Sequence, residues 1–161
     1  MNRSLLLFSG GQDSTTVLAW CLKKFDEVYL ISFDYGQRHL IEINAAKKII
    51  KKINHSFSKW SGKIKSSFIY KINNFEDFSK SSLTSDIAIK MSKGLPNTFV
   101  PGRNLLFYTL GASYAYDKKI EHIVSGVCQT DYSGYPDCRN STIKSLEKTI
   151  NLGMQKKFKF H

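Results

Sequence analysis

A short apolar run leads straight into a pair of glycines and then into a helix, and this order constrains the fold more than any other feature of the chain. Residues 4–8 are mostly Leu and Phe, residues 9–15 read Ser-Gly-Gly-Gln-Asp-Ser-Thr, and residues 15–22 read as the start of a helix. Adjacent glycines let the backbone turn its N–H groups inward, and the positive end of a following helix favours anions. The order therefore predicts a phosphate-binding loop at a strand-to-helix turn.

The loop differs from the common nucleotide P-loop, because no Lys-Ser/Thr pair follows its glycines. Hydroxyl groups and backbone amides must then hold the phosphates. The carboxylate of Asp13 is a candidate Mg²⁺ ligand, since hard cations prefer oxygen. The simpler alternative is an ordinary turn in which Asp13 or Ser14 serves as the N-cap of the helix.

Length and composition indicate one domain without a membrane anchor. A chain of 161 residues with 42% hydrophobic content can build one core. No apolar stretch approaches the roughly 18 residues of a membrane span, so we expect a cytoplasmic protein. The three cysteines, Cys21, Cys128 and Cys138, are an odd number without a Cys-x-x-Cys pair, which argues against a disulfide framework and against a zinc site formed by this chain alone.

The net charge of +11 raises the question of nucleic-acid binding, because clustered basic residues attract phosphate backbones. Lys47, Lys48, Lys51 and Lys52, however, alternate with apolar residues along one helical pattern and read as a solvated helix face. We therefore do not expect direct nucleic-acid binding. Arginine is the more selective signal, since three of only four arginines fall inside the polar blocks described next.

Strand-like and helix-like stretches alternate along the chain. We expect strands over 27–33, 55–60 and 121–127, helices over 40–53 and 103–116, and the beginning of a further strand over 156–160. This alternation predicts a single α/β domain, residues 1–161, with a doubly wound, mostly parallel, Rossmann-like sheet. Residues 61–94 are rich in Ser and Lys and are interpreted as an inserted lid or a mobile edge.

Three polar blocks follow the expected strands or open a helix, where ligands of doubly wound sheets bind. They are residues 33–39, 96–104 and 126–139. The last block combines two tyrosines with two carboxylates and could hold a flat heterocycle by stacking and hydrogen bonds. The alternatives are a strand-end turn in the first block, a helix cap at Asn104 in the second, and a structural Tyr-Pro turn in the third.

Taken together, the blocks resemble 7-cyano-7-deazaguanine synthases, which belong to the superfamily of PP-loop ATP pyrophosphatases. The resemblance rests on Ser-Gly-Gly-Gln-Asp-Ser-Thr-Thr, Phe-Asp-Tyr-Gly-Gln-Arg-His, Ser-Ser-Leu-Thr, Pro-Asn-Thr-Phe-Val-Pro-Gly-Arg-Asn and Ser-Gly-Tyr-Pro-Asp-Cys-Arg, in that order. It implies an adenine nucleotide alpha hydrolase-like fold. The implied reaction joins ammonia to 7-carboxy-7-deazaguanine with ATP and Mg²⁺, and yields the nitrile precursor of queuosine in tRNA.

The resemblance also implies roles for individual residues. Arg38 and Arg103 are the candidate catalytic residues, and Asp131, Tyr135, Asp137 and Arg139 are the candidate contacts to the heterocycle. The implied ATP-binding segment consists of Phe8, Ser9, Gly10, Gly11, Gln12, Asp13, Ser14, Thr15, Thr16, Val17 and Leu18.

One departure from the family pattern concerns zinc. The family carries a cysteine cluster for structural Zn²⁺ in a C-terminal part, and no such cluster occurs before His161. We therefore expect a truncated chain without zinc ligands and with weak or no activity. Two alternatives stay open, namely an inactive nucleotide-binding remnant and a PP-loop enzyme that adenylates a base in tRNA. A homodimer is a candidate assembly.

Overall fold

The structure, a computed structural model, describes residues 1–36, 41–75, 98–127 and 135–161. Its parallel sheet has the strand order β3-β2-β1-β4-β5. The strands are β1 (Arg3–Leu7), β2 (Glu27–Asp34), β3 (Ile64–Lys71), β4 (His122–Ser125) and β5 (Lys159–Phe160). The helices are α1 (Gln12–Lys24), α2 (Ile41–Ser56), α3 (Arg103–Asp117) and α4 (Asn140–Met154), with a short 3-10 turn η2 (Pro136–Cys138). This arrangement confirms the predicted doubly wound α/β fold.

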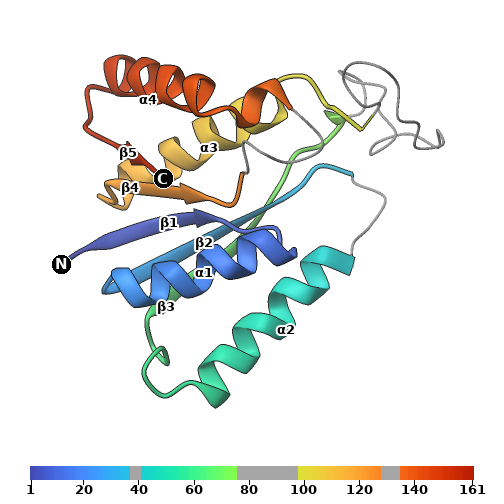
Figure 1. The fold of residues 1–161 in the computed structure, drawn as a ribbon, viewed down its shortest axis with the longest axis vertical. Coiled ribbons are helices and arrows are strands. Elements are labelled where there is room, and N and C mark those ends of the chain that lie inside the picture. Colours follow the sequence, from blue (N-terminus) through green and yellow to red (C-terminus); the bar gives the residue numbers. More distant parts are fainter. Residues whose placement is uncertain (37–40, 76–97, 128–134) are drawn as a thin grey trace.

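Helices cover both faces of the sheet, which is why its central strands are almost wholly apolar. Figure 1 shows α1 and α2 on one face and α3 and α4 on the other. Successive residues of β1 point to opposite faces, so Leu6 joins the core under α1 and α2 while Leu5 joins the core under α3 and α4. Both side chains are fully buried, and each stabilises the fold by about 1.5–3 kcal/mol.

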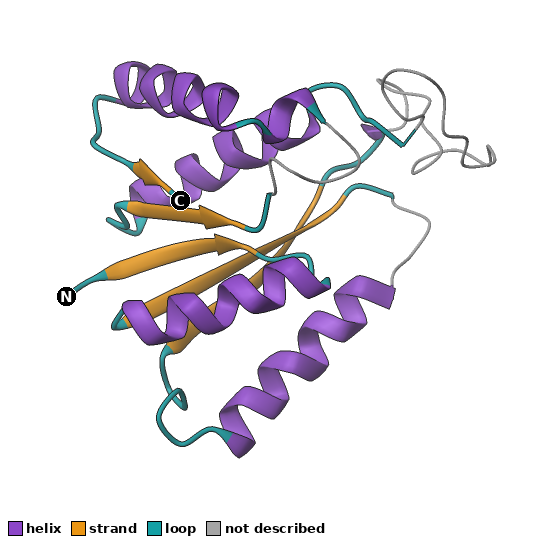
Figure 2. Cartoon of the chain, viewed as in Figure 1, coloured by secondary structure: helices purple, strands orange, loops and turns teal. Residues whose placement is uncertain are grey.

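The order of the strands reverses at β1. From β1 the chain passes through α1 to β2 on one side, whereas β4 pairs with β1 on the other side. Ligands of such sheets bind beyond the carboxyl ends of the strands at this switch point. The segments that follow β1 and β4 meet there, and Figure 2 shows both leaving the sheet at the same edge.

Most predicted elements are confirmed, but the third strand was placed wrongly. Residues 55–60 are not a strand, because α2 continues to Ser56 and a turn follows it. The strand is β3, at Ile64–Lys71, inside the segment interpreted as a lid or an edge. β3 is an edge strand with most of its side chains exposed, so it lacks the buried alternation by which strands are detected. Residues 76–94 of that segment lie outside the described residues.

The lysine-rich pattern on α2 is the solvated face that the sequence predicted. Lys47, Lys48, Lys51 and Lys52 are exposed, while Ala46 and Ile53 are buried against the sheet. Within the described ranges, none of the helices has the length and apolar character needed to cross a bilayer.

Candidate functional site

Three residues between β1 and α1, together with Ser14 in the first turn of α1, form a closed hydrogen-bond network. The Ser14 hydroxyl donates to the Gly11 carbonyl at 3.0 Å and accepts the Gly10 amide at 3.1 Å. The Gly11 amide donates to the Ser9 hydroxyl at 3.2 Å, and the two serine oxygens lie 3.1 Å apart. Gly10 has a φ of 88°, a conformation that side chains disfavour. Gly10 is therefore required by the turn, and Ser14 organises the loop.

The loop starts from a fixed point in the sheet. The Phe8 amide donates to the Ile31 carbonyl at 2.8 Å, and the Ser32 hydroxyl donates to the Phe8 carbonyl at 2.6 Å. Val17 and Leu18, at the far end of the predicted ATP segment, pack into the core under α1.

Helix α1 begins without a side-chain cap. Its N-cap is Gly11, so the alternative that Asp13 or Ser14 is the N-cap is wrong. The hydroxyls of Thr15 and Thr16 turn back onto the carbonyls of the preceding turn, at 2.8 and 3.1 Å. The first N–H groups of α1 receive no hydrogen bond from a capping side chain. The positive end of the helix dipole therefore faces the loop. Asp13 is exposed in this first turn, where a carboxylate can share a cation with a bound phosphate.

Gly126 touches the phosphate-binding loop from β4, and sequence reasoning had given it no role. A Cβ atom at this position would lie 3.0 Å from the Ser14 nitrogen and 3.1 Å from the Asp13 carbonyl carbon. Real Cβ atoms rarely come so close to backbone, so only glycine allows β4 to approach α1 here. In the sequence, this close contact is indicated by a glycine near the end of the predicted strand 121–127.

Arg103 and Tyr35 bring two of the polar blocks together. The Arg103 Nη1 group donates to the Tyr35 hydroxyl at 3.2 Å, and its guanidinium carbon lies 5.8 Å from the centroid of the tyrosine ring. Arg103 opens α3 behind Gly102, the N-cap, whose φ is 76°. Asn104 is therefore not the cap of this helix. Arg103 thus stands at the end of β2, beside the switch point.

Asp137 contacts the start of α3. Its side chain is 5% exposed, and Oδ2 accepts the Asn104 amide at 3.1 Å. The Asn104 side-chain amide donates to the Cys138 sulfur at 3.2 Å. Tyr135 shares a hydrogen bond with the Thr98 hydroxyl, and Arg139 is the exposed N-cap of α4. Asp137 therefore joins residues 135–139 to the start of α3.

Two predicted site residues, Arg38 and Asp131, lie outside the described residues. The remaining ones fall into two groups. The phosphate-binding loop lies at the ends of β1 and β4, and the second group, Arg103, Tyr135, Asp137 and Arg139, surrounds the starts of α3 and α4.

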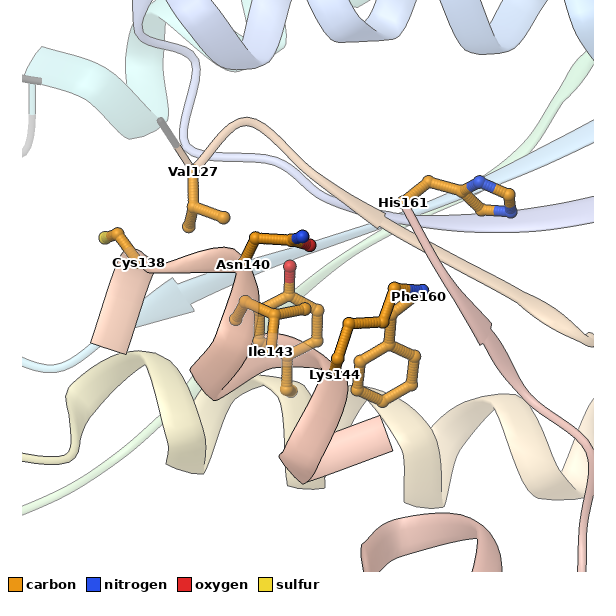
Figure 3. Close-up of a pocket in the computed structure, with 8 residues that line it drawn as sticks. Val127, Cys138, Asn140, Ile143, Lys144, Phe160 and His161 are labelled. Carbon is orange, nitrogen blue, oxygen red and sulfur yellow. The ribbon is translucent and has the colours of Figure 1, made fainter. Parts of the chain in front are cut away.

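A cavity of about 180 Å³ lies between α4 and the ends of β4 and β5. Figure 3 shows Val127 and Cys138 at one side of it, Phe160 and His161 at the other, and Asn140 between them. Tyr108, stacked on Phe160 at 4.9 Å, is fully buried. This burial raises the pKa of the Tyr108 phenol to about 12. The cavity is lined by Tyr108, Val127, Cys138, Asn140, Ile143, Lys144, Phe160 and His161.

The described ranges offer little to a metal ion. They contain no group of three or more His, Cys, Asp or Glu side chains placed to share one ion. Zinc therefore does not fit the described residues. Among the described residues, Asp13 is the candidate for a Mg²⁺ ion shared with phosphate oxygens.

Fold and loop together define a nucleotide-binding α/β protein whose phosphate-binding loop lies at the switch point of a parallel sheet. The family model described as "Queuosine biosynthesis protein QueC" matches residues 3–161. The chain therefore belongs to the QueC family.

Curated relatives carry the name 7-cyano-7-deazaguanine synthase. The one from Bradyrhizobium sp. (strain BTAi1) is 50% identical over 159 residues, and the one from Polaromonas sp. (strain JS666) is 49% identical over 156 residues. The alignments cover 98% and 96% of this chain and 66% of each relative. The chain thus spans about two thirds of the length of these proteins.

A solved structure supports the fold. It is titled "The crystal structure of predicted subunit of tRNA methyltransferase from Methanocaldococcus jannaschii DSM" and matches with a TM-score of 0.56. The match covers 100% of this chain and 67% of that one, at 15% identity. At this identity the likeness concerns the fold alone.

Proposed function

We propose that the protein is an ATP-dependent ligase that converts 7-carboxy-7-deazaguanine and ammonia into 7-cyano-7-deazaguanine. The observation that carries the proposal is the phosphate-binding loop at the switch point, in a chain about 50% identical to relatives named for this product. The two catalytic candidates, Arg38 and Arg103, are part of the same proposal.

The reaction needs activation because a carboxylate is a poor electrophile. ATP supplies it by turning one carboxylate oxygen into part of a good leaving group, so that ammonia can attack the carbon and form an amide. A second activation then allows loss of the amide oxygen and formation of the nitrile. No protein nucleophile is required, so the contribution of the chain is positioning and charge stabilisation.

The phosphate-binding loop performs the first part of this task. Its glycine amides and the first amides of α1 bind phosphate oxygens, and the Ser9 and Ser14 hydroxyls exchange their mutual hydrogen bonds for bonds to the ligand. Asp13 would hold Mg²⁺, which would supply positive charge to the bound phosphates. The fixed start of the loop at Phe8 keeps these donors in place during the reaction.

Arg103 performs the second part. Its Nη1 group is oriented by the Tyr35 hydroxyl, and a guanidinium presents several N–H groups in one plane. The other N–H groups of Arg103 bind the oxygens that gain charge as the carboxylate is activated. An arginine is needed because a lysine ammonium cannot hold Tyr35 and two oxygens in one fixed plane.

The test is a single-turnover assay with the chain in excess over 7-carboxy-7-deazaguanine, in the presence of ATP, Mg²⁺ and ammonium. We expect mass spectrometry to detect the nitrile, and the nucleotide products to distinguish ADP from AMP. ATP binding without nitrile would favour the nucleotide-binding remnant instead. Absence of ATP binding would overturn the proposal.

A further inference from the structure

The cavity beside α4 is connected to the phosphate-binding loop through two consecutive residues at the end of β4. Gly126 packs against the backbone of Asp13 and Ser14, and Val127 lines the cavity. Neighbouring Cα atoms are about 3.8 Å apart. A ligand in the cavity and a phosphate on the loop therefore lie on the two sides of one strand end.

The walls of the cavity suit a flat ring. Val127 and Ile143 provide aliphatic surface, and the ring of Tyr108, held by its stack on Phe160, closes the inner side. The volume of about 180 Å³ exceeds the ~150 Å³ of an apolar cavity that holds one benzene ring. The cavity therefore encloses about one ring of a bicyclic heteroaromatic group, and the other ring lies toward the open side.

The open side carries hydrogen-bonding groups. Asn140 can both donate and accept through its side-chain amide, as the N–H and C=O groups of a guanine-like edge require. Lys144 has three N–H donors, of which one is directed at Glu147 at 3.1 Å. Lys144 is therefore suited to a ring carbonyl oxygen. Asn140 also begins α4, whose first turn contains no acidic residue, so the positive end of the helix adds to this field.

We propose that this cavity binds the deazaguanine ring of the acid substrate, with Asn140 and Lys144 at its amide edge and its carboxylate directed past Val127 toward the phosphate-binding loop. The inference rests on the proposed function, because it names the place of that substrate. Asn140 and Lys144 thereby determine specificity. Val127, in this arrangement, separates the acid from the nucleotide.

Cys138 allows a test that does not depend on turnover, because its thiol lines the cavity. Iodoacetamide labelling of the whole chain would be followed peptide by peptide with mass spectrometry. Cys21 serves as an internal reference, since burial raises the pKa of its thiol to about 12 and keeps it unreactive. We expect 7-carboxy-7-deazaguanine to slow the labelling of Cys138 at least about tenfold, and ATP alone to leave it unchanged.

Substitutions sharpen the test. Asn140→Ala and Lys144→Ala should each weaken this protection by about tenfold, the loss expected for one hydrogen bond to a ligand, with ATP affinity unchanged. Lys148→Ala is the matched control, because Lys148 is exposed on the same helix and does not line the cavity. Circular dichroism verifies that each variant is folded.

The outcomes separate the two proposals. If ATP binds and the nitrile forms while the acid does not protect Cys138, the cavity assignment is wrong and the proposed function stands. Protection by ATP alone would also overturn the assignment, because the adenine would then occupy the cavity. If neither ligand binds, both proposals fail.

Discussion

The backbone nitrogen of Ser14 lies so close to Gly126 that a Cβ atom on Gly126 would stand only 3.0 Å from it. Ser14 belongs to α1 and Gly126 follows β4, so this approach joins two segments that are far apart in the sequence. It fixes the distance between the phosphate-binding loop and the strand end from which the cavity is reached.

Gly126→Ala should therefore weaken ATP binding. The new methyl group forces α1 and β4 apart, and displaced loop amides bind phosphate less well, so we expect at least about a tenfold loss of affinity. Gly153→Ala is the control, since a Cβ atom there meets nothing within 4 Å. Gly153 lies in the last turn of α4, so this substitution should leave the stability unchanged or raise it by less than about 1 kcal/mol. Calorimetric titration measures the ATP affinity of each variant, and thermal unfolding measures its stability. Equal ATP affinity in the two variants would contradict the role of Gly126.

Ser14→Ala should loosen the loop, because the hydroxyl bonds Ser9, Gly10 and Gly11 at once. Its removal leaves the Gly10 amide without this acceptor and costs about 1–2 kcal/mol of unfolding free energy. ATP affinity should fall with it. Thr149→Ala removes a comparable hydroxyl that bonds a carbonyl of α4, away from the loop, and should leave ATP affinity unchanged. The prediction fails if both variants bind ATP like the original chain.

Arg103→Lys should slow nitrile formation while sparing the fold. Lysine keeps the charge but loses the planar set of donors, so we expect the single-turnover rate to fall by at least about tenfold. Tyr35→Phe removes only the hydroxyl that orients Arg103 and should have a smaller effect. Rapid-quench measurements compare the two variants. An unchanged rate in Arg103→Lys would remove Arg103 from the proposed mechanism.

Asp137→Ala should destabilise the protein, because the buried carboxylate accepts the Asn104 amide at the start of α3. Leaving that amide unpaired costs about 1–3 kcal/mol. Asp137→Asn keeps an oxygen acceptor and should cost less. Urea unfolding measures the difference. If Asp137→Ala unfolds like the original chain and only the affinity for the acid falls, Asp137 is a substrate contact rather than a structural one.

The free energy of unfolding should fall as the pH drops below about 6.5, because two neighbouring histidines resist protonation in the folded chain. His122 Nδ1 and His161 Nε2 lie 2.9 Å apart. Burial lowers the pKa of His122, helped by the charge of Lys159, and burial together with the charge of His122 lowers the pKa of His161. The unfolded chain then binds more protons in the window just below pH 6.5. Stability is therefore present above that window and lost as the pH falls through it.

Urea unfolding at pH 7.5 and at pH 5.5 measures this loss. His122→Gln should flatten the pH dependence, since it removes one of the two titrating groups. His55→Gln is the control, because His55 is exposed at the end of α2. An equally steep pH dependence in His122→Gln would show that other groups cause it.

Much of the fold could be predicted because buried elements leave a periodic trace in the sequence. β1 and β2 are covered on both faces and read as apolar runs, and α2 shows its lysine face beside its buried residues. β3 was not predicted because most of its side chains are exposed. Its exposed side chains, such as Phe68 and Tyr70, show no alternation between a core and a solvent face.

What the sequence alone determined is the chemistry of the loop, because Ser9 to Thr15 bond one another within a few residues and need no distant partner. Only the tertiary structure decided the rest of the site. It brought Gly126 against Ser14, Arg103 to Tyr35 and Asp137 to Asn104. These pairs depend on the order of the strands and on close packing, and neither leaves a local pattern in the sequence.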